Sequence, residues 1–271
     1  MLDGFMTYLY ENERSSATIE KYMRDVKRFV SCLDRKAVDK SAVLEYKASL
    51  SKSYAIRSAN SMLASVNAFL RFLGWHELCV KQFKVQNDAY CSKERELSKA
   101  DYNALVRAAE RLNNKRLSLV VQTICASGIR VSELRFITAE AVRRGEALVS
   151  CKGKTRKVFI VKELQRKLIK YMREQGTESG AIFVTKRGKP LDRSNIWRQM
   201  KGLCKEAGVS ARKVFPHNLR HLFARTFYGI EKDIARLADI LGHSSVNTTR
   251  IYTVSSGTEH QRRMENMHLI L

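Results

Sequence analysis

Only two of the 271 residues are proline, Pro190 and Pro216. Proline interrupts helices because it has no amide proton and its ring clashes with the preceding turn. Long helices are therefore allowed over almost the whole chain, and the spacing of apolar residues decides where they lie. The sequence predicts a mainly α-helical protein.

The first ninety residues repeat apolar side chains at helical spacing, which predicts a unit of four or five helices. The expected helices cover residues 2–12, 16–32, 41–51 and 55–73. The polar stretch 85–96 breaks this period and predicts a linker. We expect a domain boundary near residue 92, and hence two domains, residues 1–91 and 92–271.

The second part of the chain mixes helices with a few short strands. Ser98 and Asp101 have the spacing of a capping box at a helix start. An apolar helix over 117–127 ends at Gly128, and two runs of β-formers within 146–161 flank a turn, as in a hairpin. A third short strand is expected over 181–185. Further helices are expected over about 194–206, 217–228, 231–241 and 245–252.

The charge of the chain is strongly basic. Lys and Arg number 50 against 27 Asp and Glu, a formal net charge of +23, and the basic residues occur in nearly every segment. This excess predicts a polyanionic partner and an electropositive folded body. DNA, RNA, the ribosome and an anionic membrane surface all fit, and a basic surface kept for solubility is the structural alternative.

Several other functions are not indicated. The six cysteines are scattered without a CxxC pair or a histidine at zinc-ligand spacing, so neither a metal site nor a disulfide framework is expected. There is no signal-peptide pattern, and no apolar run approaches the roughly 20 residues that span a bilayer. We expect a protein of the cytoplasm, associated with the nucleoid in a bacterium.

Five residues in four short segments carry side chains suited to phosphodiester chemistry. They are Arg130 after the helix-ending glycine, His217 and Arg220 on one face of a helix start, His243 in a turn, and Tyr252 nine residues later. Each has an ordinary structural explanation when taken alone. Their order and spacing carry the argument.

Together these residues resemble the tyrosine recombinases, including phage and transposon integrases and the Xer type. The resemblance covers residues 95–255, and the N-terminal helices resemble the family's SAM-like core-binding domain. It implies a helical DNA core-binding domain, then an α-rich catalytic domain with a small antiparallel sheet and a C-terminal tail. It also implies cleavage and rejoining of DNA strands through a covalent 3′-phosphotyrosyl intermediate, for integration, excision or resolution.

The chemistry explains these residue types. A tyrosine hydroxyl has a pKa near 10, so Tyr252 is a weak nucleophile unless nearby cations favour its anion. Arg130 and Arg220 supply that field, and their planar forks suit the non-bridging oxygens of a scissile phosphate. The resemblance implies that His217 and His243 hydrogen-bond the phosphoryl oxygens and help manage the nucleophile's proton.

The resemblance also implies a lysine in the hairpin turn as the general acid for the departing 5′ oxygen. The family's turn usually has a Lys-Gly-x-Lys-x-Arg pattern, and here Lys152-Gly153-Lys154-Thr155-Arg156 is one residue shorter. Lys152 is the first choice and Lys154 the alternative. Glu133 is expected to orient Arg130 or the helix that carries it, so that its removal weakens activity without abolishing it.

The implied partner is double-stranded DNA, bound by a homotetramer that holds two duplexes. No cofactor and no metal are required, because the phosphotyrosyl bond nearly conserves the energy of the bond that is broken. A type IB topoisomerase-like enzyme, which would relax DNA by the same chemistry, is the alternative function. A DNA-binding module without catalysis would have no need of Tyr252.

Overall fold

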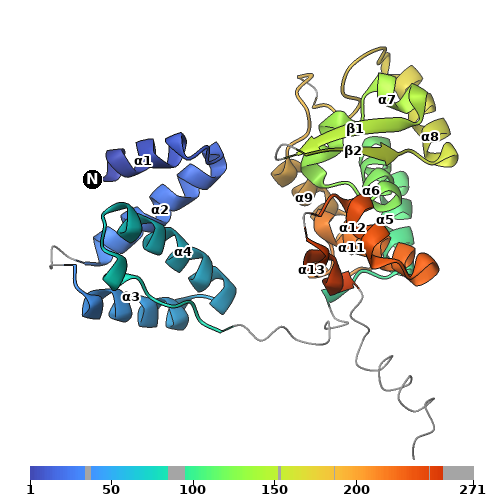
Figure 1. The fold of residues 1–271 in the computed structure, drawn as a ribbon. Coiled ribbons are helices and arrows are strands. Elements are labelled where there is room, and N and C mark those ends of the chain that lie inside the picture. The colour runs from blue at the N-terminus through green and yellow to red at the C-terminus, as the bar shows by residue number, and fades with distance from the viewer. Residues whose placement is uncertain (34–37, 85–94, 152–153, 186, 244, 253–271) are drawn as a thin grey trace, which may run out of the picture. The chain divides into compact units, whose positions relative to one another are not determined.

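The computed structural model describes residues 1–33, 38–84, 95–151, 154–185, 187–243 and 245–252. The chain forms two compact units, Met1–Asn87 and Asp88–Leu271 (Figure 1). The expected linker falls largely on residues 85–94, which lie outside the described residues. Among the described helices, none is long and apolar enough to cross a membrane.

Unit 1 is helical, as the periodicity predicts. Its helices are α1 (Leu2–Glu11), α2 (Ser16–Cys32), α3 (Lys40–Ser53) and α4 (Ile56–Phe72), followed by the 3-10 turn η1 (His76–Leu78). Helices α2 and α3 begin at side-chain caps, Ser15 and Asp39. The apolar faces meet in a core whose fully buried members include Phe5, Val26 and Leu63.

Unit 2 is built around an apolar helix. Its elements before the hairpin are α5 (Lys99–Arg111), α6 (Lys115–Ser127), η3 (Val131–Phe136) and α7 (Ala139–Arg144). Helix α5 starts with the expected capping box, in which Ser98 Oγ accepts from the Asp101 amide at 3.0 Å and the Asp101 carboxylate accepts from the Ser98 amide at 2.9 Å. Val121 and Ile124 of α6 are fully buried in the main core.

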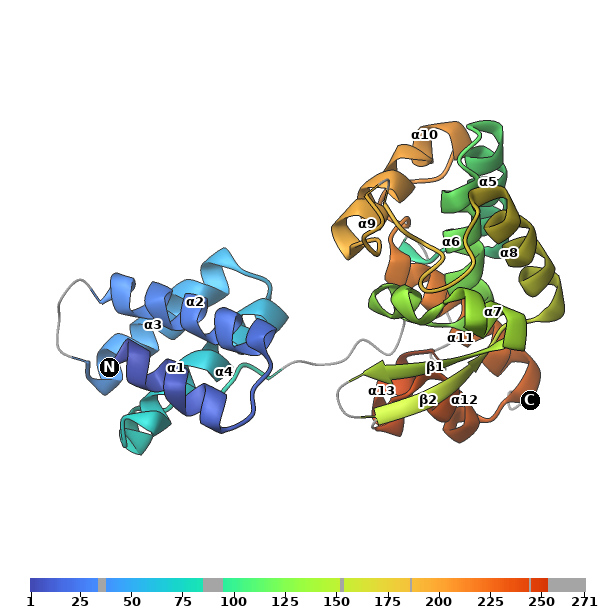
Figure 2. The same ribbon diagram turned by 90° about the horizontal axis from the view of Figure 1, so that it is seen from above.

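The hairpin is the expected one, with antiparallel strands β1 (Glu146–Cys151) and β2 (Lys154–Phe159) in the register that pairs Val149 with Arg156. The remaining elements are α8 (Lys162–Gln175), α9 (Arg193–Gly202), α10 (Cys204–Ala207), α11 (Pro216–Glu231), α12 (Ile234–Leu241), α13 (Val246–Thr249) and η4 (Arg250–Tyr252). Figure 2 shows β2 lying alongside α12, with which it is in contact. Helix α11 packs on α6 and also contacts α12, so α12 connects the hairpin to the helices of the core.

The expectation of a third strand over 181–185 is wrong. The described residues form a sheet of two strands, and this segment makes only isolated bridges, Thr138 with Ala181 and Val184 with Pro190. Its Val184 carbonyl accepts a hydrogen bond from Arg116 Nη1 at 2.7 Å, where a neighbouring strand would otherwise pair. Two β-forming side chains of this segment, Ile182 and Phe183, are instead buried in the main core.

Gly128 ends α6 in the left-handed conformation, with φ +65°, and a Cβ added there would lie 2.6 Å from Cε1 of Phe223. We expect Gly128→Ala to lower the free energy of unfolding by roughly 2–4 kcal/mol, because backbone strain and overpacking add. Gly176→Ala is the matched control, since Gly176 has φ +62° with open space around it; it should cost about 1 kcal/mol. Denaturant unfolding compares them, and equal losses would contradict the steric argument.

Candidate active site

Arg220 is deeply buried, at 1% exposure. Its Nη1 donates to the Gly128 carbonyl at 2.6 Å, and its Nη2 donates to the Leu241 carbonyl at 2.6 Å and to His243 Nε2 at 3.0 Å. Burial, with a contribution from Arg130, lowers the pKa of Arg220 to about 10. The side chain therefore stays cationic at neutral pH and links α11, the end of α6 and the end of α12.

Three successive carbonyls at the end of α12 each accept a hydrogen bond from a different arginine. The pairs are Ile240 O with Arg156 Nε at 3.1 Å, Leu241 O with Arg220 Nη2 at 2.6 Å, and Gly242 O with Arg130 Nη2 at 3.2 Å. The last carbonyls of a helix have no intrahelical partner and carry partial negative charge. The C-terminus of α12 is thus where three guanidinium groups from distant segments come together.

Glu133 balances two of these cations. Its carboxylate, 1% exposed, accepts from Arg130 Nη1 at 2.9 Å and from Arg156 Nη1 and Nη2 at 3.0 and 2.8 Å, and it also accepts from the Arg130 amide at 2.7 Å. Burial alone would raise the pKa of Glu133, but the hydrogen bonds from Arg156 and Arg130 outweigh it and hold that pKa below its usual value. The expected contact between Glu133 and Arg130 is present, and Arg156 adds a second partner.

A cavity of about 670 Å³ opens beside these arginines, and Arg130, His217 and Arg220 line it together with Arg193 and Trp197. His217 is the second residue of α11, one turn before Arg220, which follows from Pro216 starting the helix. His217 is exposed to the cavity, but partial desolvation by the surrounding residues and the charge of Arg220 lower its pKa, so the imidazole is neutral at neutral pH. The cavity therefore presents three cations, Arg130, Arg193 and Arg220, and one neutral histidine.

Tyr252 lies on η4 and is 4% exposed, packed with Leu237 and Leu241 of α12. Its ring meets the ring of His221 edge to face at 4.8 Å between centroids and stacks on His243 at 6.0 Å. Burial raises the pKa of Tyr252, while the charges of Arg220 and Arg130 lower it by less. The expected field of the arginines is present, but the net result in the DNA-free protein is a protonated phenol.

Sequence reasoning did not assign Arg156, His221 or Thr249 to the site. Arg156 had a signal, because the period of two places it on the same strand face as the buried Val158. His221 follows His217 by one helical turn, and their rings are 4.5 Å apart. Nothing in the local pattern marks Thr249, whose contact with His243 depends on how the chain turns after α12.

The structure describes the side chain of neither candidate general acid. Lys152 lies outside the described residues, and Lys154 begins β2 with a side chain that is likewise not described. The choice between them stays a prediction. Within the described ranges, no three His, Cys, Asp or Glu side chains gather as metal ligands would.

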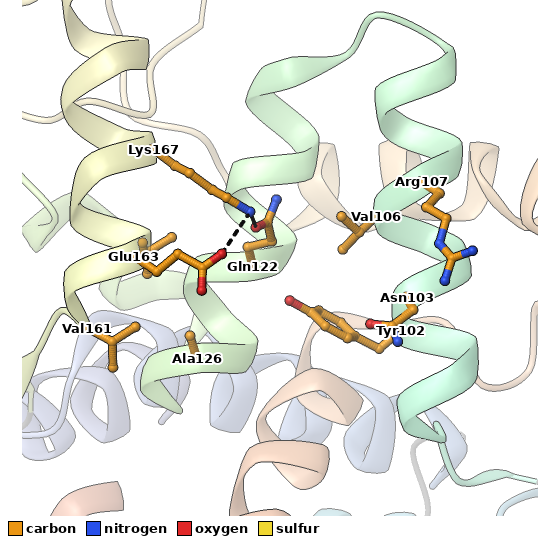
Figure 3. Close-up of a pocket in the computed structure, with 10 residues that line it drawn as sticks. Tyr102, Asn103, Val106, Arg107, Gln122, Ala126, Val161, Glu163 and Lys167 are labelled. Carbon is orange, nitrogen blue, oxygen red and sulfur yellow. Dashed lines mark hydrogen bonds and ion pairs between the residues drawn. The ribbon is translucent and has the colours of Figure 1, made fainter.

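Another pocket, of about 420 Å³, lies away from this cluster between α5, α6 and α8 (Figure 3). None of the cluster residues lines it. Of its two cations, Arg107 and Lys167, the second is engaged with Gln122 Oε1 at 3.0 Å and Glu163 Oε1 at 3.7 Å. We therefore place the candidate active site at the arginine cluster.

The partly buried histidines His221 and His243 predict a loss of stability in mild acid. Burial lowers the pKa of His221 to about 3 and that of His243 to about 4, with His217 and Arg220 among the further causes. Below the ordinary value of 6.5 the unfolded chain binds protons that the folded chain refuses, so stability falls with pH by up to about 1.4 kcal/mol per unit for each histidine. The lowered pKa of Glu133 also makes stability fall with decreasing pH, but only below the ordinary pKa of a carboxyl group, at more acidic pH.

Denaturant unfolding at pH 7 and pH 5 tests this. We expect His221→Phe to reduce the slope of the unfolding free energy against pH, by the contribution of about one bound proton. The control is His76→Gln, which replaces an exposed histidine. Equal slopes in the parent and His221→Phe would contradict the expectation.

Comparison with known proteins places this geometry in a family. Residues 95–259 match the phage integrase family, and residues 2–77 match the phage integrase N-terminal SAM-like domain. The tyrosine recombinase XerA of Thermococcus kodakarensis is 30% identical over 275 residues, which cover 98% of this chain and 94% of that protein. XerA of Pyrococcus furiosus is 27% identical and covers 100% and 94%.

Solved structures agree in fold. A crystal structure of XerA recombinase superposes with a TM-score of 0.55 at 27% identity and covers 100% of this chain and 98% of that one. A lambda integrase tetramer bound to a Holliday junction superposes with a TM-score of 0.72 at 20% identity, covering 90% and 76%. Both matched domains therefore occur here in the same order as in known recombinases.

Proposed function

Because the chain belongs to the phage integrase family, we propose that Tyr252 is the nucleophile with which it cleaves DNA. The enzyme is a tyrosine recombinase, which breaks and rejoins DNA strands at specific sites through a 3′-phosphotyrosyl intermediate. One observation supports the assignment most: the buried guanidinium of Arg220 lines the cavity and also binds His243, whose ring stacks on Tyr252.

Arg130 and Arg220 bind the scissile phosphate. Arg220 is held by two carbonyls and His243 through its Nη atoms, and its buried Nε has no partner among the described residues. A buried donor without a partner is costly, and a phosphate oxygen would satisfy it. Because the protein already holds both guanidiniums in place, little reorganisation is needed when charge builds up in the transition state.

The remaining residues manage protons and position. His217 and His243 bind the phosphoryl oxygens, and Lys152, or Lys154 in its place, protonates the departing 5′ oxygen. Glu133 orients Arg130 and Arg156 without touching the substrate. Tyr252 Oη forms a bond to phosphorus as the bond to the 5′ oxygen breaks, and a 5′ hydroxyl of another strand reverses the step.

DNA is the partner of this enzyme, and its assembly and surroundings are proposals. We propose a homotetramer on two duplexes, supported by the fold likeness to lambda integrase, which was solved as a tetramer on a Holliday junction. Residues 1–91 would contribute core-site binding and residues 92–271 catalysis. The net charge of +23 suits this partner. The cytoplasm, where the nucleoid lies, is the proposed location.

A covalent trap tests the proposed function. Selection from a random duplex pool gives a sequence that the protein binds. A duplex of that sequence is then nicked close to the cleavage site. After cleavage, the short fragment with the free 5′ hydroxyl diffuses away, so that religation is blocked and the adduct accumulates. We expect a denaturation-resistant adduct whose DNA-linked peptide contains Tyr252. An adduct on another residue, or none, would contradict the assignment. On a plasmid with two sites, recombinant joints are expected, whereas relaxation alone would favour a topoisomerase-like activity.

A further inference from the structure

His243 is held on both sides of its ring. Its Nε2 lies 3.0 Å from Arg220 Nη2, and its Nδ1 lies 2.8 Å from Thr249 Oγ1. Thr249 is fully buried at the end of α13, three residues before Tyr252. The same short segment thus carries the nucleophile and the group that holds the histidine stacked on it.

These contacts determine where the proton of the neutral imidazole lies. Arginine can only donate, so Nε2 of His243 must be the acceptor toward Arg220. A neutral imidazole carries one N–H, which is then on Nδ1 and donates to the Thr249 hydroxyl. The lowered pKa of His243, about 4, keeps the ring neutral at pH 7. Without DNA, His243 therefore presents an acceptor, not a donor, toward the arginines.

We propose that Thr249 is a positioning residue for strand cleavage, whose hydroxyl accepts the Nδ1 proton of His243 and so keeps the Nε2 lone pair directed into the active site. The proposal rests on the proposed function, since it concerns the reaction at Tyr252. When Tyr252 Oη bonds to phosphorus, an acceptor at Nε2 can take up the phenolic proton and then donate it in a hydrogen bond to a phosphoryl oxygen, while Nδ1 stays on Thr249. In the DNA-free protein, a neutral ring with Nε2–H would instead point that proton at the Arg220 donor.

Two substitutions separate the hydroxyl of Thr249 from its methyl group. Thr249→Val keeps the shape and removes the acceptor, whereas Thr249→Ser keeps the hydroxyl and removes the methyl. We expect Thr249→Val to slow single-turnover cleavage at saturating DNA by about 10-fold or more, with unchanged DNA affinity. Thr249→Ser should recover most of the rate. If buried packing is what matters, Thr249→Ser is the slower variant, and the proposal is wrong.

The tautomer of His243 can be measured without DNA and without any enzymatic reaction. Nitrogen-15 NMR of the imidazoles should assign His243 of the parent as protonated on Nδ1, with the Nε2–H form gaining population in Thr249→Val. Parent protein with Nε2–H would overturn the proposal even if Tyr252 forms its adduct. Parent protein with the Nδ1–H form but no adduct at Tyr252 would instead refute the proposed function. Unfolding curves establish that both variants are folded.

Discussion

Tyr252→Phe is expected to bind the selected duplex with the parent's affinity and to form no covalent adduct, a loss on the order of 10⁴-fold or more in cleavage rate. The substitution removes only the hydroxyl group, and the ring keeps its contacts with His221 and His243. Because the buried phenol has a raised pKa, its loss should not disturb the charge balance of the arginines at neutral pH. Binding and adduct formation are measured on the same nicked duplex.

The matched control is Tyr228→Phe, since Tyr228 packs against the same apolar cluster as Tyr252. It should form the adduct at the parent's rate. An adduct that persists in Tyr252→Phe would overturn the assignment of the nucleophile. Loss of the adduct in both variants would show that the cluster needs its tyrosine hydroxyls for another reason.

Glu133→Gln is expected to lower the free energy of unfolding by roughly 3–5 kcal/mol, because it removes the charge that two arginines share in a buried site. The amide has nearly the shape of the carboxylate, so no cavity forms. Its NH2 group, however, faces guanidinium donors from Arg130 or Arg156. Cleavage should weaken without being abolished, since Arg130 and Arg220 remain.

Glu146→Gln is the control, because Glu146 pairs with Lys157 at 3.2 Å in a partly exposed position on the hairpin. It should cost less than about 1 kcal/mol. Thermal and denaturant unfolding at pH 7 compare the two variants. Equal small losses would mean that the Glu133 pairs contribute no more than a surface ion pair.

Local patterns predicted most of the elements. The helices of unit 1 follow from apolar spacing, the start of α5 from the Ser98–Asp101 box, and the hairpin from β-formers around a turn, because such signals act between residues a few positions apart. The prediction of a strand at 181–185 was wrong for a related reason. β-formers show a preference for extended chain, but a strand also needs a neighbour, and here Arg116 occupies the Val184 carbonyl.

The sequence by itself determined which residues could carry the chemistry: it predicted Tyr252, the two arginines and the two histidines from their types and spacing. Only the tertiary structure decided how they act together. Arg130, Arg156 and Arg220 meet at α12 from 112, 84 and 21 residues away, and no local pattern encodes that meeting. The physical reason is that unpaired helix carbonyls and a buried carboxylate can gather cations from any part of the chain once the core has brought those parts close.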